Sequence, residues 1–141
     1  MRILISCLLI SVVPVMAFAE NERVFEYRGT KYVTKVPNEA PAEPAWTPGA
    51  GEPPLTIGAA ANLAETEFKK TFGAFGTFKL ESVTLTKQGS GWMYYVAYLQ
   101  NAADISESRP GPNGGTVKRP LLVVYYITLD GVVRGPEPAA E

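Results

Sequence analysis

The side chains that most often carry catalysis or bind metals are nearly absent from this sequence. It contains no histidine, and its single cysteine, Cys7, lies close to the amino terminus. Histidine is the commonest general base and zinc ligand, and a Ser-His-Asp arrangement requires it. Thiolate nucleophiles and thiolate metal sites require cysteine. We therefore expect no metal site and no cofactor, and any catalysis would depend on Asp, Glu, Lys, Tyr or Ser alone.

Carboxylates offer the remaining acid–base chemistry, but their spacing does not pair them. Asp104 lies in a polar loop, and Asp130 belongs to an Asp-Gly pair typical of a hairpin turn. Glu65 and Glu67 are two residues apart in a predicted helix and therefore point to different sides. Glu81 becomes a candidate base only if its strand turns it inward, because burial would raise its pKa. We favour the alternative, in which a β-bulge turns Glu81 to solvent.

Aromatic side chains are the main candidates for binding. In the predicted strand 92–100, Trp92, Tyr94 and Tyr98 share one face, and Ala97 lies on the other. A single helix covers only one face, and we expect an alanine-containing helix to fit the face with Ala97. The Trp92 face then needs another cover. That cover is either the chain's own proline-rich arm, docked through its tryptophan Trp46, or a partner protein, a second copy or an apolar ligand.

A long connection between the last two long strands adds two candidates. Residues 101–118 carry the run R-P-G-P-N-G-G, and loops of this length tend to be functional or disordered. Its glycines do not lead into a helix or into Gly-Lys-Ser/Thr, so they do not form a phosphate loop. The candidate binding residues predicted from the sequence are Trp46, Trp92, Tyr94, Tyr98, Arg109 and Asn113.

The first 19 residues resemble a cleavable signal peptide. Arg2 supplies the positive charge, residues 3–16 are apolar, and Ala17-Phe18-Ala19 is the small-x-small pattern that signal peptidase accepts. The apolar stretch is shorter than the roughly 20 residues of a spanning helix. We expect cleavage after Ala19 and a secreted or periplasmic mature chain without a membrane span. An uncleaved amino-terminal anchor is the alternative.

Cleavage would leave a chain whose charge and cysteine content narrow the choice of partners. Removing 19 of 141 residues leaves 122, enough for one domain with a modest core. The leader contains one base and no acid, so 14 acidic and 13 − 1 = 12 basic residues remain, a net charge of −2. This balance gives no electrostatic case for binding nucleic acid. The absence of any disulfide favours a bacterial protein.

The pattern beyond the leader predicts an α+β fold, with one helix on a small antiparallel sheet of three to four strands. Residues 20–36 form an amino-terminal strand segment, because apolar and polar residues alternate there. Residues 37–54 contain six prolines and are expected to form a linker or an arm over the domain. The α+β domain covers residues 55–135. A flexible tail is predicted over residues 136–141.

The helix is predicted from Thr56 to Phe72, with Thr56 as its cap and Gly73 after its last turn. Its apolar stripe is predicted to contain Ile57, Ala61, Ala64, Phe68 and Phe72. The three strands that follow are expected at residues 78–87, with a bulge near Glu81-Ser82, at 92–100 and at 121–130. A type I′ turn at Asp130-Gly131 ends the last of them.

A helix followed by three antiparallel strands resembles the PepSY-type and cystatin-like domains of exported bacterial proteins. The resemblance covers about half of the chain: helix residues 63–72, then F-K-L-E-S-V-T-L, G-W-M-Y-Y-V and Y-Y-I-T-L-D-G-V-V. It implies non-enzymatic binding or inhibition of another exported protein, often a protease. The Q-x-V-x-G inhibitory motif of true cystatins does not occur in the sequence.

Three functions are compatible with these patterns. In the first, the chain is an exported, non-catalytic binding module that presents the aromatic sheet residues and the 101–118 loop to an envelope or secreted protein. In the second, helix and sheet form a cone around a small ligand pocket or active site, with tyrosine hydroxyls and Glu81 as its polar groups. In the third, the chain is a structural subunit of a homo-oligomer.

Overall fold

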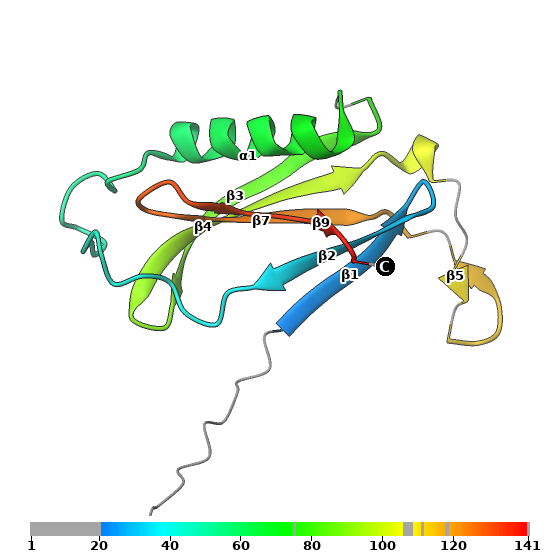
Figure 1. The fold of residues 1–141 in the computed structure, drawn as a ribbon, viewed down its shortest axis with the longest axis horizontal. Helices are drawn as coiled ribbons and strands as arrows, with labels where there is room; N and C mark the ends of the chain where they lie inside the picture. The colour runs from blue at the N-terminus through cyan, green and yellow to red at the C-terminus, as the bar shows by residue number, and fades with distance from the viewer. Residues whose placement is uncertain (1–20, 75, 106–108, 111, 118, 141) are drawn as a thin grey trace, which may run out of the picture.

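The computed structural model describes residues 21–74, 76–105, 109–110, 112–117 and 119–140, and the predicted signal peptide lies outside them. The predicted α+β fold is confirmed, since helix α1 lies on a sheet of order β3-β4-β7-β8 and a second sheet has the order β1-β2-β9 (Figure 1). All pairs in these sheets are antiparallel. The elements are β1 (Asn21–Tyr27), β2 (Thr30–Val36), α1 (Ile57–Phe72), β3 (Phe78–Gln88), β4 (Gly91–Gln100), a 3-10 turn (Ala102–Asp104), β5 (Arg109–Pro110), β6 (Thr116–Val117), β7 (Leu122–Thr128), β8 (Val133–Arg134) and β9 (Glu137–Pro138).

Both predicted caps of α1 are confirmed. The hydroxyl of Thr56 accepts a hydrogen bond from the Ala59 amide at 3.2 Å, and the Gly73 amide donates to the Lys69 carbonyl. Gly73 has a φ of 78°, a conformation that glycine adopts at little cost. The sequence motif therefore fixes where the helix begins and ends.

The buried stripe of α1 differs from the predicted one. Ala60, Ala64 and Phe68 are fully buried, whereas Ile57 is 58% exposed and Ala61 is half-buried. The stripe therefore follows every fourth residue from Ala60. Ile57 is the first residue of the helix, one turn before Ala60.

The prediction of which sheet face α1 covers is wrong. Phe68 of α1 lies 4.7 Å from the ring of Tyr98, and Tyr94, Val96 and Tyr98 share one core cluster with the helix. We call this side of the sheet the helix face and the opposite side, with Met93, the far face. The small side chains of Ala60 and Ala64 explain the choice, because they leave room for large tyrosine rings beneath the helix.

The predicted bulge in β3 is confirmed. The register between β3 and β4 shifts between Leu80 and Ser82, and Glu81 is exposed there. The tight turn predicted at Gln88-Gly89-Ser90-Gly91 is also present, since Gln88 pairs with Gly91. Gly89 has a φ of 62° as the first central residue, which is the glycine position of a type II′ hairpin turn.

The turn after β7 is a hairpin, but its predicted type is wrong. The Gly131 amide donates to the Thr128 carbonyl, and the Thr128 amide donates to the Val132 carbonyl. This is a three-residue connection with Gly131 in the left-handed region, rather than a two-residue type I′ turn. Asp130 accepts a hydrogen bond from the Thr128 hydroxyl, and this contact is compatible with its negative φ.

The carboxyl-terminal segment is paired rather than free, which corrects the predicted flexible tail over residues 136–141. Glu137 and Pro138 form β9 beside β2, and the Ala139 amide donates to the Lys31 carbonyl at 2.8 Å. Pro138 does not disturb this arrangement, because an edge strand tolerates a residue without an amide donor. The chain passes directly from β8 in one sheet to β9 in the other, and this joins the two sheets.

Candidate functional site

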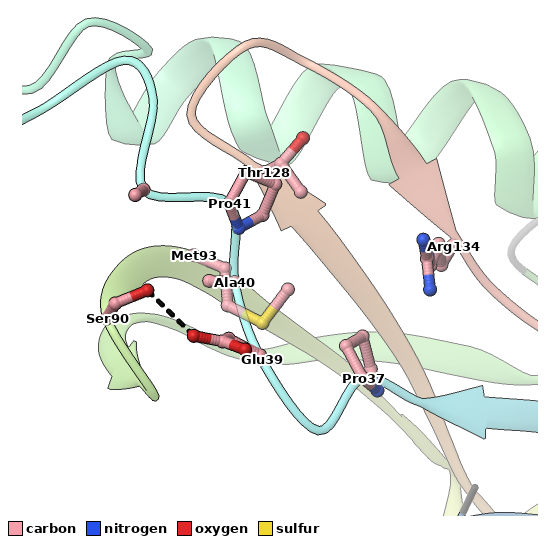
Figure 2. Close-up of a pocket in the computed structure, with 9 residues that line it drawn as sticks. Pro37, Glu39, Ala40, Pro41, Ser90, Met93, Thr128 and Arg134 are labelled. Carbon is pink, nitrogen blue, oxygen red and sulfur yellow. Dashed lines mark hydrogen bonds between the residues drawn. The ribbon is translucent and has the colours of Figure 1, made fainter. Parts of the chain in front are cut away.

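The proline-rich arm, residues 37–54, wraps around the turn between β3 and β4. On the far face Ala40 packs with Met93, and the Ala40 amide donates to the Gln88 carbonyl at 2.9 Å. Figure 2 shows Glu39 of the arm beside Ser90, whose hydroxyl donates to its carboxylate at 2.8 Å. This stretch also lines a pocket of about 310 Å³, formed by Pro37, Glu39, Ala40, Pro41, Ala42, Ser90, Met93, Thr128 and Arg134.

On the helix face the arm brings Trp46 against Trp92. The two rings lie 5.5 Å apart in an edge-to-face arrangement, and the Trp46 indole donates to the Gly51 carbonyl at 3.1 Å. Both side chains are half-buried. Of the covers considered for Trp92, the structure therefore contains the internal one, the chain's own arm.

Tyr94 and Tyr98, also predicted as binding residues, are core residues under α1. They are 2% and 1% exposed, and the Tyr94 hydroxyl donates to the Leu55 carbonyl at 2.7 Å. Burial, with a smaller contribution from Glu65, raises the pKa of Tyr98 to about 12. The hydroxyl is therefore neutral near pH 7, and neither ring is available to a partner of the folded chain.

Tyr94→Phe is expected to lower the free energy of unfolding by about 1 kcal/mol, because the Leu55 carbonyl loses a buried donor. Tyr125→Phe is the matched control. The Tyr125 hydroxyl is buried without a hydrogen-bond partner of suitable geometry among the described residues. Removal of the Tyr125 hydroxyl should leave the free energy of unfolding unchanged or raise it. Urea unfolding of both variants measures the difference, and an equal loss in both would contradict the assignment of this hydrogen bond.

Arg109 and Asn113 lie apart from the four aromatic residues. Arg109 begins the small β5–β6 hairpin, where it pairs with Val117, and Asn113 is exposed in the connection between the two strands. Figure 1 shows this hairpin at the opposite end of the molecule from the arm that carries Trp46. The structure therefore does not assemble the six predicted residues into one site.

The far face contains a groove that the sequence did not single out. About 320 Å³ of open space is lined by Val36, Thr84, Thr86, Gln88, Met93, Tyr95 and Tyr126. The rings of Tyr95 and Tyr126 are 5.7 Å apart, and the Arg23 guanidinium lies 5.9 Å from the Tyr95 ring centre. Burial raises the pKa of Tyr126, and Arg23 partly offsets this effect. The groove therefore combines an aromatic floor with threonine hydroxyls, and the Arg23 guanidinium lies near one of its rings.

Strand β3 borders this groove and is an edge strand of its sheet. Two hydrogen bonds show which way the backbone of β4 points. The Asn101 amide donates to the Thr77 carbonyl, toward β3, and the Gln100 amide donates to the Leu121 carbonyl, toward β7. Backbone direction alternates along a strand. The odd-numbered residues of β4 therefore direct their amides and carbonyls toward β3.

This alternation determines which groups of β3 point away from β4. Thr84 lies opposite Tyr95 and Thr86 opposite Met93, so both threonines bond with β4. Val83, Leu85 and Lys87 must then direct their amides and carbonyls away from the sheet. At the end of the strand, the arm crosses the far face, where the Ala40 amide donates to the Gln88 carbonyl. Among the described residues, an open row of backbone donors and acceptors remains beside the groove.

The only carboxylate proposed as a base does not occupy an enclosed site. The Glu81 side chain is 47% exposed, and its nearest recorded charged partner is Lys79 at 3.8 Å. Within the described ranges, no three His, Cys, Asp or Glu side chains gather in a way that could hold a metal. Nor does the described part of the chain contain a helix long and apolar enough to cross a membrane.

No family model matches the chain, and neither the curated proteins nor the solved structures gave a match.

Proposed function

We propose that this chain is an exported, non-catalytic binding module that takes an extended polypeptide segment at the open edge of β3. The observation that carries the proposal is the outward row of backbone groups at Val83, Leu85 and Lys87, next to a side-chain groove. Strand addition of this kind uses main-chain hydrogen bonds for affinity and side-chain pockets for specificity.

The composition of β3 supports pairing over a limited stretch. Residues 82–86 read S-V-T-L-T, which contains no charge and no proline and is rich in residues with high β-propensity. Charged residues lie at its two ends, Lys79 and Glu81 before it and Lys87 after it. Natural edge strands use such charges to prevent indiscriminate pairing. The uncharged stretch would therefore accept about five residues of a partner strand.

The groove gives an added strand a place for alternate side chains. Successive side chains of a strand point to opposite faces, so every second one would lie beside Thr84 and Thr86. From there it would reach the floor formed by Met93 and Tyr95. Apolar or aromatic side chains suit this floor, and the nearby Arg23 would favour an acidic neighbour.

Export is part of the same proposal. The leader at residues 1–19, with its Ala17-Phe18-Ala19 cleavage pattern, supports delivery to the periplasm or the exterior. The resemblance to PepSY-type and cystatin-like domains supports a binding role among exported proteins. The exposure of Glu81 weighs against the cone-shaped active site that was the alternative.

Thr84→Lys tests the site directly. Thr84 is exposed at the centre of the open stretch, so lysine places a charge in the groove without disturbing the core. We expect wild-type protein to select extended peptides from a displayed library of short random sequences. Affinity for the selected peptides should fall about tenfold or more in Thr84→Lys, a loss of about 1.4 kcal/mol.

Thr66→Lys is the matched control, because Thr66 is exposed on α1 and the substitution adds the same charge. It should bind the selected peptides as the wild type does. Failure to select any peptide, or equal binding by Thr84→Lys, would refute the proposed site.

A further inference from the structure

We infer that the polypeptide that pairs with β3 is β3 of a second copy of this chain, joined antiparallel about a twofold axis at Thr84. This inference rests on the proposed function, because it uses the same edge and names the partner. A twofold interface presents one surface to itself, so its residues must complement one another. Both the backbone and the charges of β3 meet this requirement.

The backbone of β3 pairs with itself in this register. With Thr84 opposite its own symmetry mate, Val83 lies opposite the partner's Leu85, and Leu85 opposite the partner's Val83. Val83 and Leu85 both direct their amides and carbonyls away from β4. Each such pair can therefore exchange two hydrogen bonds across the axis, as antiparallel ladders require. Thr84 would form the pair without hydrogen bonds at the centre, where side chains approach most closely.

The charges select this register from its neighbours. With the twofold axis at Thr84, Glu81 lies opposite the partner's Lys87. The symmetry produces this attractive pair twice. An axis at Val83 would instead place Lys79 opposite the partner's Lys87, two like charges that repel. An axis at Leu85 would place Glu81 opposite the partner's Gly89, beside the carboxylate of Glu39 in the partner's arm, so that two like charges would meet.

The side chains on both faces also fit. On the helix face, Val83 and Leu85 are half-buried in the single chain, and a second copy would cover their open sides. Leu80 is 49% exposed and would lie near the partner's Gln88. On the far face, Ser82 would lie opposite the partner's Thr86, and the two grooves would meet at the axis. The paired stretch is short, so we expect a dimer that dissociates on dilution.

A charge-swap experiment tests the inference. The chain is used without residues 1–19, the predicted signal peptide. Sedimentation equilibrium at low salt over a wide range of concentrations should show a monomer–dimer equilibrium. Glu81→Lys and Lys87→Glu should each weaken dimerisation about tenfold or more, because each turns two attractive pairs into repulsive ones.

The double variant Glu81→Lys/Lys87→Glu restores opposite charges and should recover dimerisation to near the wild-type level. Glu81 and Lys87 are exposed, so all three variants are expected to fold. Glu52→Lys, an exposed change of the same charge on the arm, should dimerise as the wild type does. Single variants without effect, or a double variant no better than the single ones, would overturn the inference.

The two proposals can fail separately. A wild-type chain that stays monomeric at every concentration, yet selects peptides that Thr84→Lys no longer binds, would leave the edge as the binding site and exclude a second copy as its occupant. Insensitivity of both dimerisation and peptide selection to Thr84→Lys would refute the edge itself.

Discussion

Replacing Gly91 with alanine is expected to lower the free energy of unfolding by about 2 to 3 kcal/mol, a typical cost of overpacking. A Cβ atom at this position would lie 2.1 Å from the Pro41 carbonyl oxygen and 2.6 Å from the Ala40 carbonyl oxygen. These are backbone atoms of the arm and cannot rotate away as a flexible side chain can. The arm must therefore shift away from the β3–β4 turn, and its contacts with Gln88 and Ser90 weaken. Thermal or urea unfolding measures the loss.

Gly58→Ala is the matched control for this prediction, with the opposite sign. Gly58 belongs to the first turn of α1, and apart from its chain neighbours and the helix backbone no atom of the described residues lies within 4 Å of its Cβ position. Alanine there should stabilise the protein by about 0.5 kcal/mol, because it limits the freedom of the unfolded chain. Tryptophan fluorescence adds a second measurement, since displacement of the arm in Gly91→Ala separates Trp46 from Trp92. Unchanged fluorescence and stability in Gly91→Ala would show that the arm is not held by this contact.

The local chemistry of the sequence was sufficient to predict the helix and the bulge. Thr56 and Gly73 have side-chain and backbone properties that determine a helix end, whatever the rest of the fold does. The phase change between Leu80 and Val83 likewise requires an irregularity at Glu81, because side chains alternate strictly along a strand. Such features depend on neighbouring residues only, and they are visible without knowledge of tertiary contacts.

The orientation of β4 could not be predicted from its residues. Trp92, Tyr94 and Tyr98 on one face and Met93 and Tyr95 on the other are all apolar or aromatic, so alternation contains no information about which face the helix covers. The answer depends on α1, whose alanines leave space for large rings. An error in this one assignment moved Tyr94 and Tyr98 from the core to a predicted surface, and it hid the groove at Tyr95.

The path of the arm was also beyond local prediction. Its prolines indicate an extended segment without regular hydrogen bonding, and this is compatible with a free linker or with a docked one. Docking depends on the few groups that proline leaves intact, such as the Ala40 amide, which finds the Gln88 carbonyl. Trp46 was the one signal in the sequence, because a tryptophan in a free linker would expose a large apolar surface.

Phe68→Ala is expected to produce the largest loss of stability among the substitutions considered, about 3 to 5 kcal/mol. Phe68 is fully buried at the centre of the core between α1 and the sheet. Its ring lies 4.7 Å from Tyr98, 4.9 Å from Phe72 and 5.4 Å from Phe78, so alanine would remove these aromatic contacts and leave a cavity. A domain of this size has only about 5 to 15 kcal/mol of stability, so the variant should be close to unfolding at 37 °C.

Ile57→Ala separates the observed stripe from the one that periodicity predicts. Ile57 and Phe68 both belong to the predicted stripe, yet Ile57 is 58% exposed. Truncation of Ile57 should therefore change the free energy of unfolding by no more than about 0.5 kcal/mol. Equilibrium unfolding in urea, followed by circular dichroism, gives both values on the same scale. A large loss in Ile57→Ala together with a small one in Phe68→Ala would mean that the core lies under the first turn of α1 rather than under Phe68, which would contradict the burial seen in this structure.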